Sequence, residues 1–310
     1  MKESAMPFQK FHPARMLISP TFAVLSGLAF ISSLRADSVI LAPVGDTFLP
    51  EFAAHFPGPN GSGVDMVIGT QGFFAGFAWN RGLIKFDLTA LPTNAFIDSV
   101  TLQITVTKTP NGGESSFFHL HAVKVAWTES VSTWLIRSAG QNWTTPGGAA
   151  GTDYAGDSSG NAFVGGLGTY TFETTTGLVA DVTGWVHSPA SNQGWLLKTE
   201  DESVDLTARR FGARENPSRF PQLTVQYTVP PLPPQIDSVG IEGTNFCVNF
   251  QGVAGKNYVL ESREEVGSGD WAVVTGLVAE TDGPQKFCDP LMGQKRFYRV
   301  GLLWLGWPGF

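Results

Sequence analysis

The amino-acid sequence predicts an all-β protein with two modules, and three observations favour this class. Across residues 38–227, short strand-like runs are separated by turn clusters, and hardly any stretch keeps a helical apolar period for about ten residues. The 310-residue chain has 36 Gly and 20 Pro and only 15% charged residues, which is typical of a turn-rich globular protein. A proline-rich linker at 229–234 then separates this part from a second group of strand-like runs.

The first 36 residues differ from the rest and are typical of a signal peptide. Lys2, Lys10 and Arg15 precede an apolar run at 16–34, and Ala36 offers a small residue for cleavage. The alternative is an uncleaved membrane anchor, but the proline and glycine inside the run weaken it as a spanning helix. We expect export, a mature chain that starts near position 37, and no membrane partner after cleavage.

Charge argues against a nucleic-acid partner. Residues 1–36 carry four basic side chains and one acidic one, so their removal changes the net charge from −7 to −10. Binding to phosphates needs clustered cations over an extended face, which such a chain does not offer in general. An anionic partner would have to find a local basic patch.

Residues 99–107 alternate polar and apolar side chains, which predicts a strand with Val100, Leu102, Ile104 and Val106 on one buried face. The pattern continues at 118–125 after the turn residues 110–113, which suggests a hairpin, and returns at 223–227. The stretch 144–168 is rich in Gly, Ser, Thr and Asn. We expect irregular surface loops there, where binding sites tend to lie.

The second module, residues 235–303, has strand-like runs at 236–241, 245–250, 257–261, 271–274 and 297–300. This spacing suggests a small immunoglobulin-like or fibronectin-like β-sandwich. Cys247 and Cys288, the only two cysteines, both fall in this module, and an exported chain favours a disulfide between them over two free thiols. The apolar tail 304–310 is too short to span a bilayer and has no assigned role.

Short catalytic motifs are missing, including Gly-x-Ser-x-Gly, His-Glu-x-x-His and a phosphate-binding Gly-rich loop. Glycosidases and lyases need no short motif, so this is only weak evidence against an enzyme. His119 and His121 share one strand face at a spacing that suits a metal, but no third ligand lies nearby in the sequence. We favour two half-exposed strand histidines.

Two further clusters have both a binding and a structural interpretation. Glu200, Asp201, Glu202 and Asp205 could supply oxygens to a structural calcium ion, but the Gly-punctuated Asp-x-Asp spacing is missing, so a solvated hairpin tip is preferred. Tryptophan can cover the apolar face of a sugar. Trp79 and Trp143 are the candidates for exposed platforms, whereas Trp127, Trp185 and Trp195 are expected in the core.

Several segments taken in order carry a family resemblance. They are residues 80–88, 127–129, 131–134, 143, 147–148, 181–183, 185, 192–195, 211–215 and 221–227. Together they resemble the disaggregatase-related DNRLRE domain, which is classed as a carbohydrate-binding module of family 96. The series covers nearly all of residues 38–228, and it departs from the family at Ala213, where Ser commonly precedes Arg-Glu.

This resemblance implies a jelly-roll-like β-sandwich that binds polysaccharide, including acidic glycans of the alginate type, and it brings no catalytic residues. The C-terminal module similarly resembles the small immunoglobulin-like modules of bacterial surface and secreted proteins, through residues 255–261, Trp271 and residues 297–300. That second resemblance is looser.

Four arginines within eleven positions are the most basic segment: Arg209, Arg210, Arg214 and Arg219. On a strand, Arg209 and Arg210 point to opposite faces. Arg214 is expected to pair with the adjacent Glu215, which leaves Arg209 or Arg210, Arg219 and also Arg81 as candidates to bind carboxylates bidentately. The alternative is that the acidic cluster at 200–205 neutralises these cations on a solvated surface.

The function that these observations favour is a secreted, non-catalytic protein that binds polysaccharide, with acidic glycans as the expected class. Two alternatives stay open. One is a structural or adhesion protein of the cell surface or matrix, and the other is a polysaccharide lyase or hydrolase on the same fold.

Overall fold

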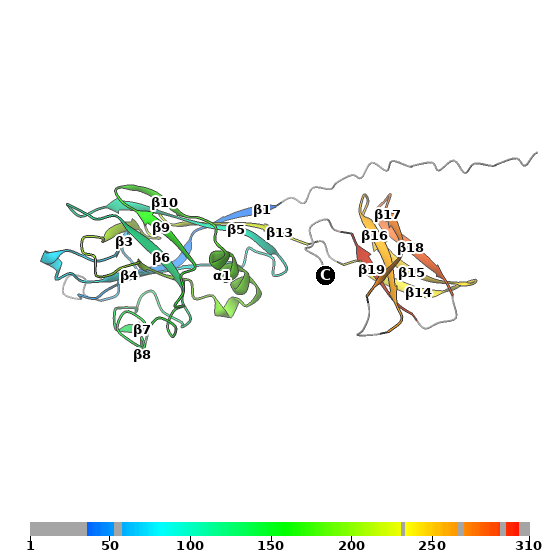
Figure 1. Ribbon diagram of the computed structural model, residues 1–310, viewed down its shortest axis with the longest axis horizontal. Coiled ribbons are helices and arrows are strands. Elements are labelled where there is room, and N and C mark those ends of the chain that lie inside the picture. The colour runs from blue at the N-terminus through cyan, green and yellow to red at the C-terminus, as the bar shows by residue number, and fades with distance from the viewer. Residues whose placement is uncertain (1–35, 53–57, 231–232, 266–269, 292–295, 304–310) are drawn as a thin grey trace, which may run out of the picture. The chain divides into compact units, whose positions relative to one another are not determined.

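The computed structural model describes residues 36–52, 58–230, 233–265, 270–291 and 296–303. The expected signal segment up to residue 35 and the apolar tail 304–310 lie outside these ranges. The described residues form a mostly β protein with a large domain and two small C-terminal sheets (Figure 1). No helix in this part of the chain is long and apolar enough to cross a membrane.

The large domain is built on two large antiparallel sheets, and β7 (Ile136–Ser138) and β8 (Gln141–Asn142) form a further two-stranded one. The first has the order β1-β13-β5-β12-β3, and β10 also pairs with β5. Its strands are β1 (Asp37–Leu41), β3 (Asp65–Ile68), β5 (Phe96–Lys108), β10 (Gly168–Phe172), β12 (Arg209–Gly212) and β13 (Gln222–Thr228). The second sheet has the order β2-β4-β11-β6-β9. Its strands are β2 (Pro43–Pro50), β4 (Asn80–Phe86), β6 (Ser116–Ala122), β9 (Gly160–Val164) and β11 (Trp195–Thr199).

The main core lies between these two sheets, because each strand turns alternate side chains inward. The predicted buried face of β5 is confirmed: Val100, Leu102, Ile104 and Val106 are all buried. Across the core, the rings of Phe118 on β6 and Phe211 on β12 lie 5.3 Å apart, edge to face. Alternation was therefore sufficient to predict which side chains form the core of these strands.

The predicted hairpin between residues 99–107 and 118–125 is wrong. Strand β5 pairs with β10, β12 and β13, whereas β6 pairs with β9 and β11 in the other sheet. The turn residues at 110–113 are present, and Gly112 has a left-handed φ of 69°. Turn chemistry allows the chain to reverse, but it does not determine whether the next strand pairs with the last or crosses to the facing sheet.

Among the described residues, one α-helix, α1 (Thr176–His187), interrupts the all-β pattern and is followed by the 3-10 turn η2 (Pro189–Ser191). The Thr175 hydroxyl caps the helix by accepting a hydrogen bond from the backbone N–H of Leu178. The buried residues are Leu178, Val182, Trp185 and Val186, at the spacing of one helical face. This face packs against β5, so the helix completes the core.

The expectation of irregular surface loops across 144–168 is wrong in part. Residues 160–164 form β9, and residues 123–159, which we call the cover segment, pack on the outer face of the second sheet. The cover segment contains the short strands β7 and β8. A second core forms beneath it from Leu49, Leu83, Val123, Trp134, Trp143, Tyr154 and Leu196.

The C-terminal residues form two three-stranded antiparallel sheets, β14-β15-β18 and β17-β16-β19. The strands are β14 (Ile236–Glu242), β15 (Asn245–Gly252), β16 (Asn257–Arg263), β17 (Ala272–Val278), β18 (Gly283–Pro290) and β19 (Phe297–Leu302). Their shared core includes Val248, Phe250, Tyr258, Leu260 and Phe287. The five predicted runs are all strands, and β18 is a sixth, which carries Cys288.

The predicted disulfide is confirmed. Cys247 on β15 and Cys288 on β18 face each other directly in the strand register, with their Cα atoms 4.1 Å apart. The bond therefore links two neighbouring strands of the same sheet.

We expect intact-mass measurement of the oxidised protein to find both thiol hydrogens missing. Under native conditions, neither Cys247 nor Cys288 should react with a thiol label, and both should react after reduction in denaturant. Labelling of both positions without reduction would contradict the bond.

Candidate functional site

The loops at one end of the large domain form the most suitable surface for a ligand. Strand β5 begins at Phe96, beside the end of β13, and finishes at Lys108, beside Arg210. Three loops, 69–79, 109–115 and 200–208, meet at the Lys108 end. They are tied together by backbone hydrogen bonds from Ala208 to Thr70 and from Glu114 to Leu206, of 2.9 and 3.1 Å.

A shallow groove of about 190 Å³, which we call the basic groove, lies at this end. It is lined by Val67, Gln71, Lys108, Thr109, Pro110, Ala208, Arg209 and Arg210. Arg210 is exposed and stands opposite Lys108 across the β12–β5 pair. The lining holds cations but no carboxylate, histidine or tyrosine, so the groove is suited to an anion in an otherwise acidic protein.

Arg209 and Arg210 point to opposite faces, as predicted from strand geometry. The Arg209 guanidinium is buried, and the burial lowers its pKa. It donates hydrogen bonds only to backbone carbonyls, those of Glu114, Gly165, Leu206, Thr207 and Ala208, at 2.6–3.1 Å. Arg209 therefore holds the surrounding loops together beneath the groove and has little capacity left for a ligand.

Arg81, the other candidate cation on a strand, is buried on β4 and fully engaged. Its Nε and Nη2 donate to the two carboxylate oxygens of Glu202 at 2.8 and 2.7 Å, and its Nη1 donates to the carbonyls of Gly147 and Gly148. The guanidinium carbon also lies 5.2 Å from the centre of the Trp134 ring. This placement gives Arg81 a structural role, because it fastens the cover segment to the second sheet.

The remaining two arginines lie in the loop between β12 and β13. Arg214 forms ion pairs with Glu129 at 3.0 Å and Glu215 at 2.6 Å, which confirms the expected Arg214–Glu215 pair. Arg219 is exposed, but it does not line the basic groove. Of the predicted cations, Arg209 and Arg210 line the groove, and of these two only Arg210 is exposed.

Trp143 is not the exposed platform that the sequence suggested. It is only 5% exposed, it belongs to the core beneath the cover segment, and its Nε1 donates to the carbonyl of Thr133. Trp79 is 37% exposed and follows a turn that sequence reasoning missed, η1 (Phe73–Ala75). The available signal was the run 69–79, which has no charged residue and contains three phenylalanines and one tryptophan.

Two of the four acidic residues proposed for calcium, Asp201 and Glu202, are engaged with different partners. Glu202 accepts from Arg81 and lies 3.5 Å from Lys198, and Asp201 accepts hydrogen bonds from the backbone and hydroxyl of Ser203. In the described parts of the chain, the one group of three potential ligand atoms joins Glu242 to the bonded sulfurs of Cys247 and Cys288. A bonded sulfur is not a thiolate and does not offer that metal-ligand chemistry.

The expectation of two half-exposed strand histidines holds for His119 and is wrong for His121, which is buried. His121 on β6 is buried beneath Tyr154, and its Nδ1 lies 3.0 Å from the carbonyl oxygen of Ala155. Burial lowers the pKa of both His119 and His121, so both imidazoles are held toward the neutral form at neutral pH.

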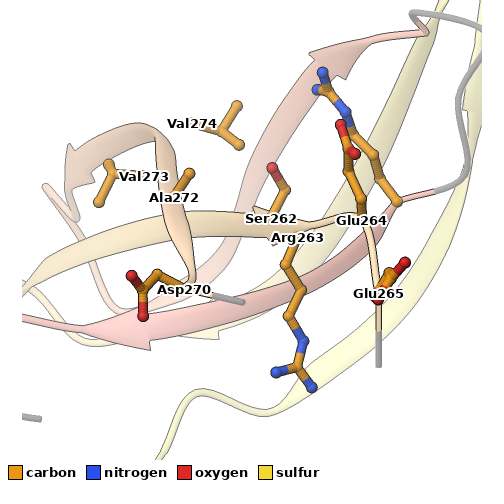
Figure 2. A pocket seen from close by; sticks show the side chains of 9 residues that line it. Ser262, Arg263, Glu264, Glu265, Asp270, Ala272, Val273 and Val274 are labelled. Carbon is orange, nitrogen blue, oxygen red and sulfur yellow. The ribbon is translucent and has the colours of Figure 1, made fainter. Parts of the chain in front are cut away.

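Two larger hollows lie away from the basic groove. One of about 450 Å³ lies between the end of β4 and the C-terminal end of α1, with Phe86, Trp185 and Val186 among its lining. The other, of about 530 Å³, lies on the C-terminal sheets and carries both Arg263 and the acids Glu264 and Asp270 (Figure 2). Its mixed charges give no preference for an anion or a cation.

Comparison with known protein families and with curated proteins finds no match to this chain. The resemblance to the DNRLRE domain therefore stays a prediction from the sequence.

Proposed function

We propose that this protein binds an acidic polysaccharide, outside the cell and without turnover, through the basic groove of its large domain. The observation that carries the proposal is the pair Arg210 and Lys108, two exposed cations in a groove whose lining contains no carboxylate, in a chain of net charge −7. An exposed cation pair in an acidic protein attracts anions locally while the rest of the surface repels them.

The chemistry of the lining suits a uronate chain. Arg210 can bind a carboxylate bidentately, and Lys108 adds a second positive charge on the facing strand. Gln71 donates its side-chain N–H to Asn80 at 3.3 Å, so its amide oxygen can accept from a sugar hydroxyl. Val67 and Pro110 supply apolar contact, and a lining without carboxylate, histidine or tyrosine favours binding over acid–base catalysis.

The finer fold assignment belongs to the same proposal. Two antiparallel sheets packed face to face support a jelly-roll-like, DNRLRE-type carbohydrate-binding sandwich. Two three-stranded sheets around a common core likewise support an immunoglobulin-like C-terminal module. The disulfide is consistent with an exported protein.

We expect the double variant Lys108→Ala/Arg210→Ala to bind alginate at least about tenfold more weakly than the parent at low salt, since it loses two charge-assisted contacts. Added salt should weaken the parent more steeply than the variant, because the lost contacts are the ones that salt screens. Isothermal titration calorimetry over a series of salt concentrations measures both effects.

The matched control is Lys124→Ala/Lys286→Ala, which also removes two positive charges, but at exposed positions outside the groove. It should bind alginate as the parent does. The proposal fails if the parent does not bind alginate, if the groove variant binds as tightly as the parent, or if both double variants weaken binding equally. Release of reducing ends or unsaturated products from alginate would instead indicate the lyase or hydrolase alternative.

A further inference from the structure

The loop 69–79, which we call the aromatic loop, exposes large apolar side chains at its tip. Phe73 is 74% exposed, Phe74 is 98% exposed and Phe77 is 48% exposed. No residue of this loop carries a charge. Scattered exposed apolar residues are normal on a protein surface, but three neighbouring phenylalanine rings on one short loop indicate an interaction site.

Backbone hydrogen bonds close the base of the aromatic loop. Gly69 and Asn80 exchange backbone hydrogen bonds at 2.8 and 3.1 Å, and the N–H of Gln71 donates to Ala78 at 3.0 Å. Phe77 has a left-handed φ of 56°, a costly conformation for a bulky residue. Such strain at an exposed tip is typical of functional segments, because the surrounding bonds must hold it in place.

The arrangement of the rings argues against a flat sugar platform. The Phe73 ring is inclined by 76° to Phe74 and by 70° to Phe77, with centroid separations of 5.7 and 5.9 Å. No pair that includes Phe73 offers a common plane on which successive sugar rings could stack. Rings that are steeply inclined to one another are better suited to fluid apolar surroundings than to a flat, rigid ligand.

We propose that the aromatic loop inserts into the interface of a lipid bilayer, with Phe73 and Phe74 deepest and Trp79 nearer the headgroups. Tryptophan favours that level because its ring is apolar and its N–H is polar. Lys108 and Arg210 flank the loop at the same end of the domain, and their positive charges complement anionic headgroups. The backbone N–H of Trp79 donates a hydrogen bond to the Glu51 carboxylate. This proposal is an alternative to the sequence expectation of no membrane partner, which stays a prediction.

The test compares the full chain with Phe73→Ser/Phe74→Ser in flotation with vesicles of phosphatidylcholine alone or mixed with phosphatidylglycerol. Both side chains are exposed, so the variant should keep the parent's melting temperature. We expect its partition coefficient to fall about hundredfold on both kinds of vesicle. Brominated lipids should quench the parent's tryptophan fluorescence, and Trp79→Phe should remove most of that quenching.

The matched control is Phe96→Ser, a partly exposed phenylalanine at the opposite end of β5, which should bind vesicles as the parent does. The Lys108→Ala/Arg210→Ala variant should keep its binding to phosphatidylcholine and lose only the extra affinity for phosphatidylglycerol. Phe73→Ser/Phe74→Ser should still bind alginate, so this inference and the glycan proposal fail separately.

Three results would overturn the inference. The first is that the parent binds neither kind of vesicle, and the second is that Phe73→Ser/Phe74→Ser binds vesicles as the parent does. The third is that light scattering finds the parent to be a dimer and this variant a monomer. The last result would assign the aromatic loop to contact with a second copy of the chain.

Discussion

Replacing Arg81 by methionine is expected to lower the free energy of unfolding of the large domain by about 3–5 kcal/mol. Methionine keeps much of the apolar stem but removes all four hydrogen bonds that the guanidinium donates to Glu202, Gly147 and Gly148. The Glu202 carboxylate, whose side chain is 11% exposed, would then keep only Lys198, 3.5 Å away. A buried charge left without its partner is the main source of the loss.

We expect the cover segment to loosen before the whole domain unfolds, because Arg81 joins three parts of the domain. Its position on β4 lies under the cover segment, and its partners lie in that segment and in the loop after β11. We therefore expect limited proteolysis of the Arg81→Met variant to cut first within residues 123–159. Arg81→Lys should fall between the variant and the parent, since an ammonium group cannot make the paired contact with a carboxylate.

Urea unfolding followed by tryptophan fluorescence measures the change, because the rings of Trp134 and Trp143 pack beside this site. Arg210→Met is the control: it removes an exposed cation of the same domain and should change stability by no more than about 0.5 kcal/mol. Equal stability of the Arg81→Met and Arg210→Met variants would show that the buried pair contributes nothing net.

The sequence was sufficient where one local rule determines the outcome. Alternation placed the inward face of β5 and separated Arg209 from Arg210, since successive side chains on a strand point to opposite faces. The expected export, together with the presence of only two cysteines in the sequence, predicted the Cys247–Cys288 bond, which is confirmed. Adjacent opposite charges predicted the Arg214–Glu215 ion pair.

The sequence was insufficient where partners come from far along the chain. Arg81 and Glu202 are 121 positions apart, and Trp143 is buried because a long segment folds back over the second sheet. The failed hairpin has the same cause, since β5 finds its partners in strands that come later in the chain. No periodicity or turn signal carries that information.

Two features were visible in the sequence but were not used. Thr175 followed by Leu178, Val182, Trp185 and Val186 is a helix cap and one apolar helical face, which predict α1. The uncharged run 69–79 likewise contained the aromatic loop. Lys108, in contrast, became a candidate only when the register placed it opposite Arg210.

A buried carboxylate on β2 should make the stability of the large domain depend on pH near neutrality. Asp46 is 1% exposed and accepts a hydrogen bond of 2.7 Å from the backbone N–H of Arg214, while its own N–H donates to Glu129 at 2.8 Å. Burial raises the pKa of Asp46 to about 7, and the nearby carboxylates of Glu215 and Glu129 add to the rise. The Arg214 contacts oppose it only in part.

The sign of the effect follows from the protons that each state binds. Between about pH 4, where an exposed aspartate titrates, and about pH 7, folded Asp46 holds a proton that the unfolded chain has released. The free energy of unfolding should therefore fall as pH rises through this window, by at most about 1.4 kcal/mol per pH unit, and then level off.

Asp46→Asn removes the titration but keeps a group of similar shape that can accept the Arg214 hydrogen bond. Relative to the parent, this variant should gain about 2–3 kcal/mol of stability between about pH 5 and pH 7, as measured by urea unfolding at intervals of pH. Asp201→Asn is the control, because that exposed carboxylate has a lowered pKa and should not alter the slope near neutrality. Parallel pH profiles for the parent and Asp46→Asn would mean that Asp46 is already ionised at about pH 5 in the folded protein, and that Arg214 outweighs the effect of burial.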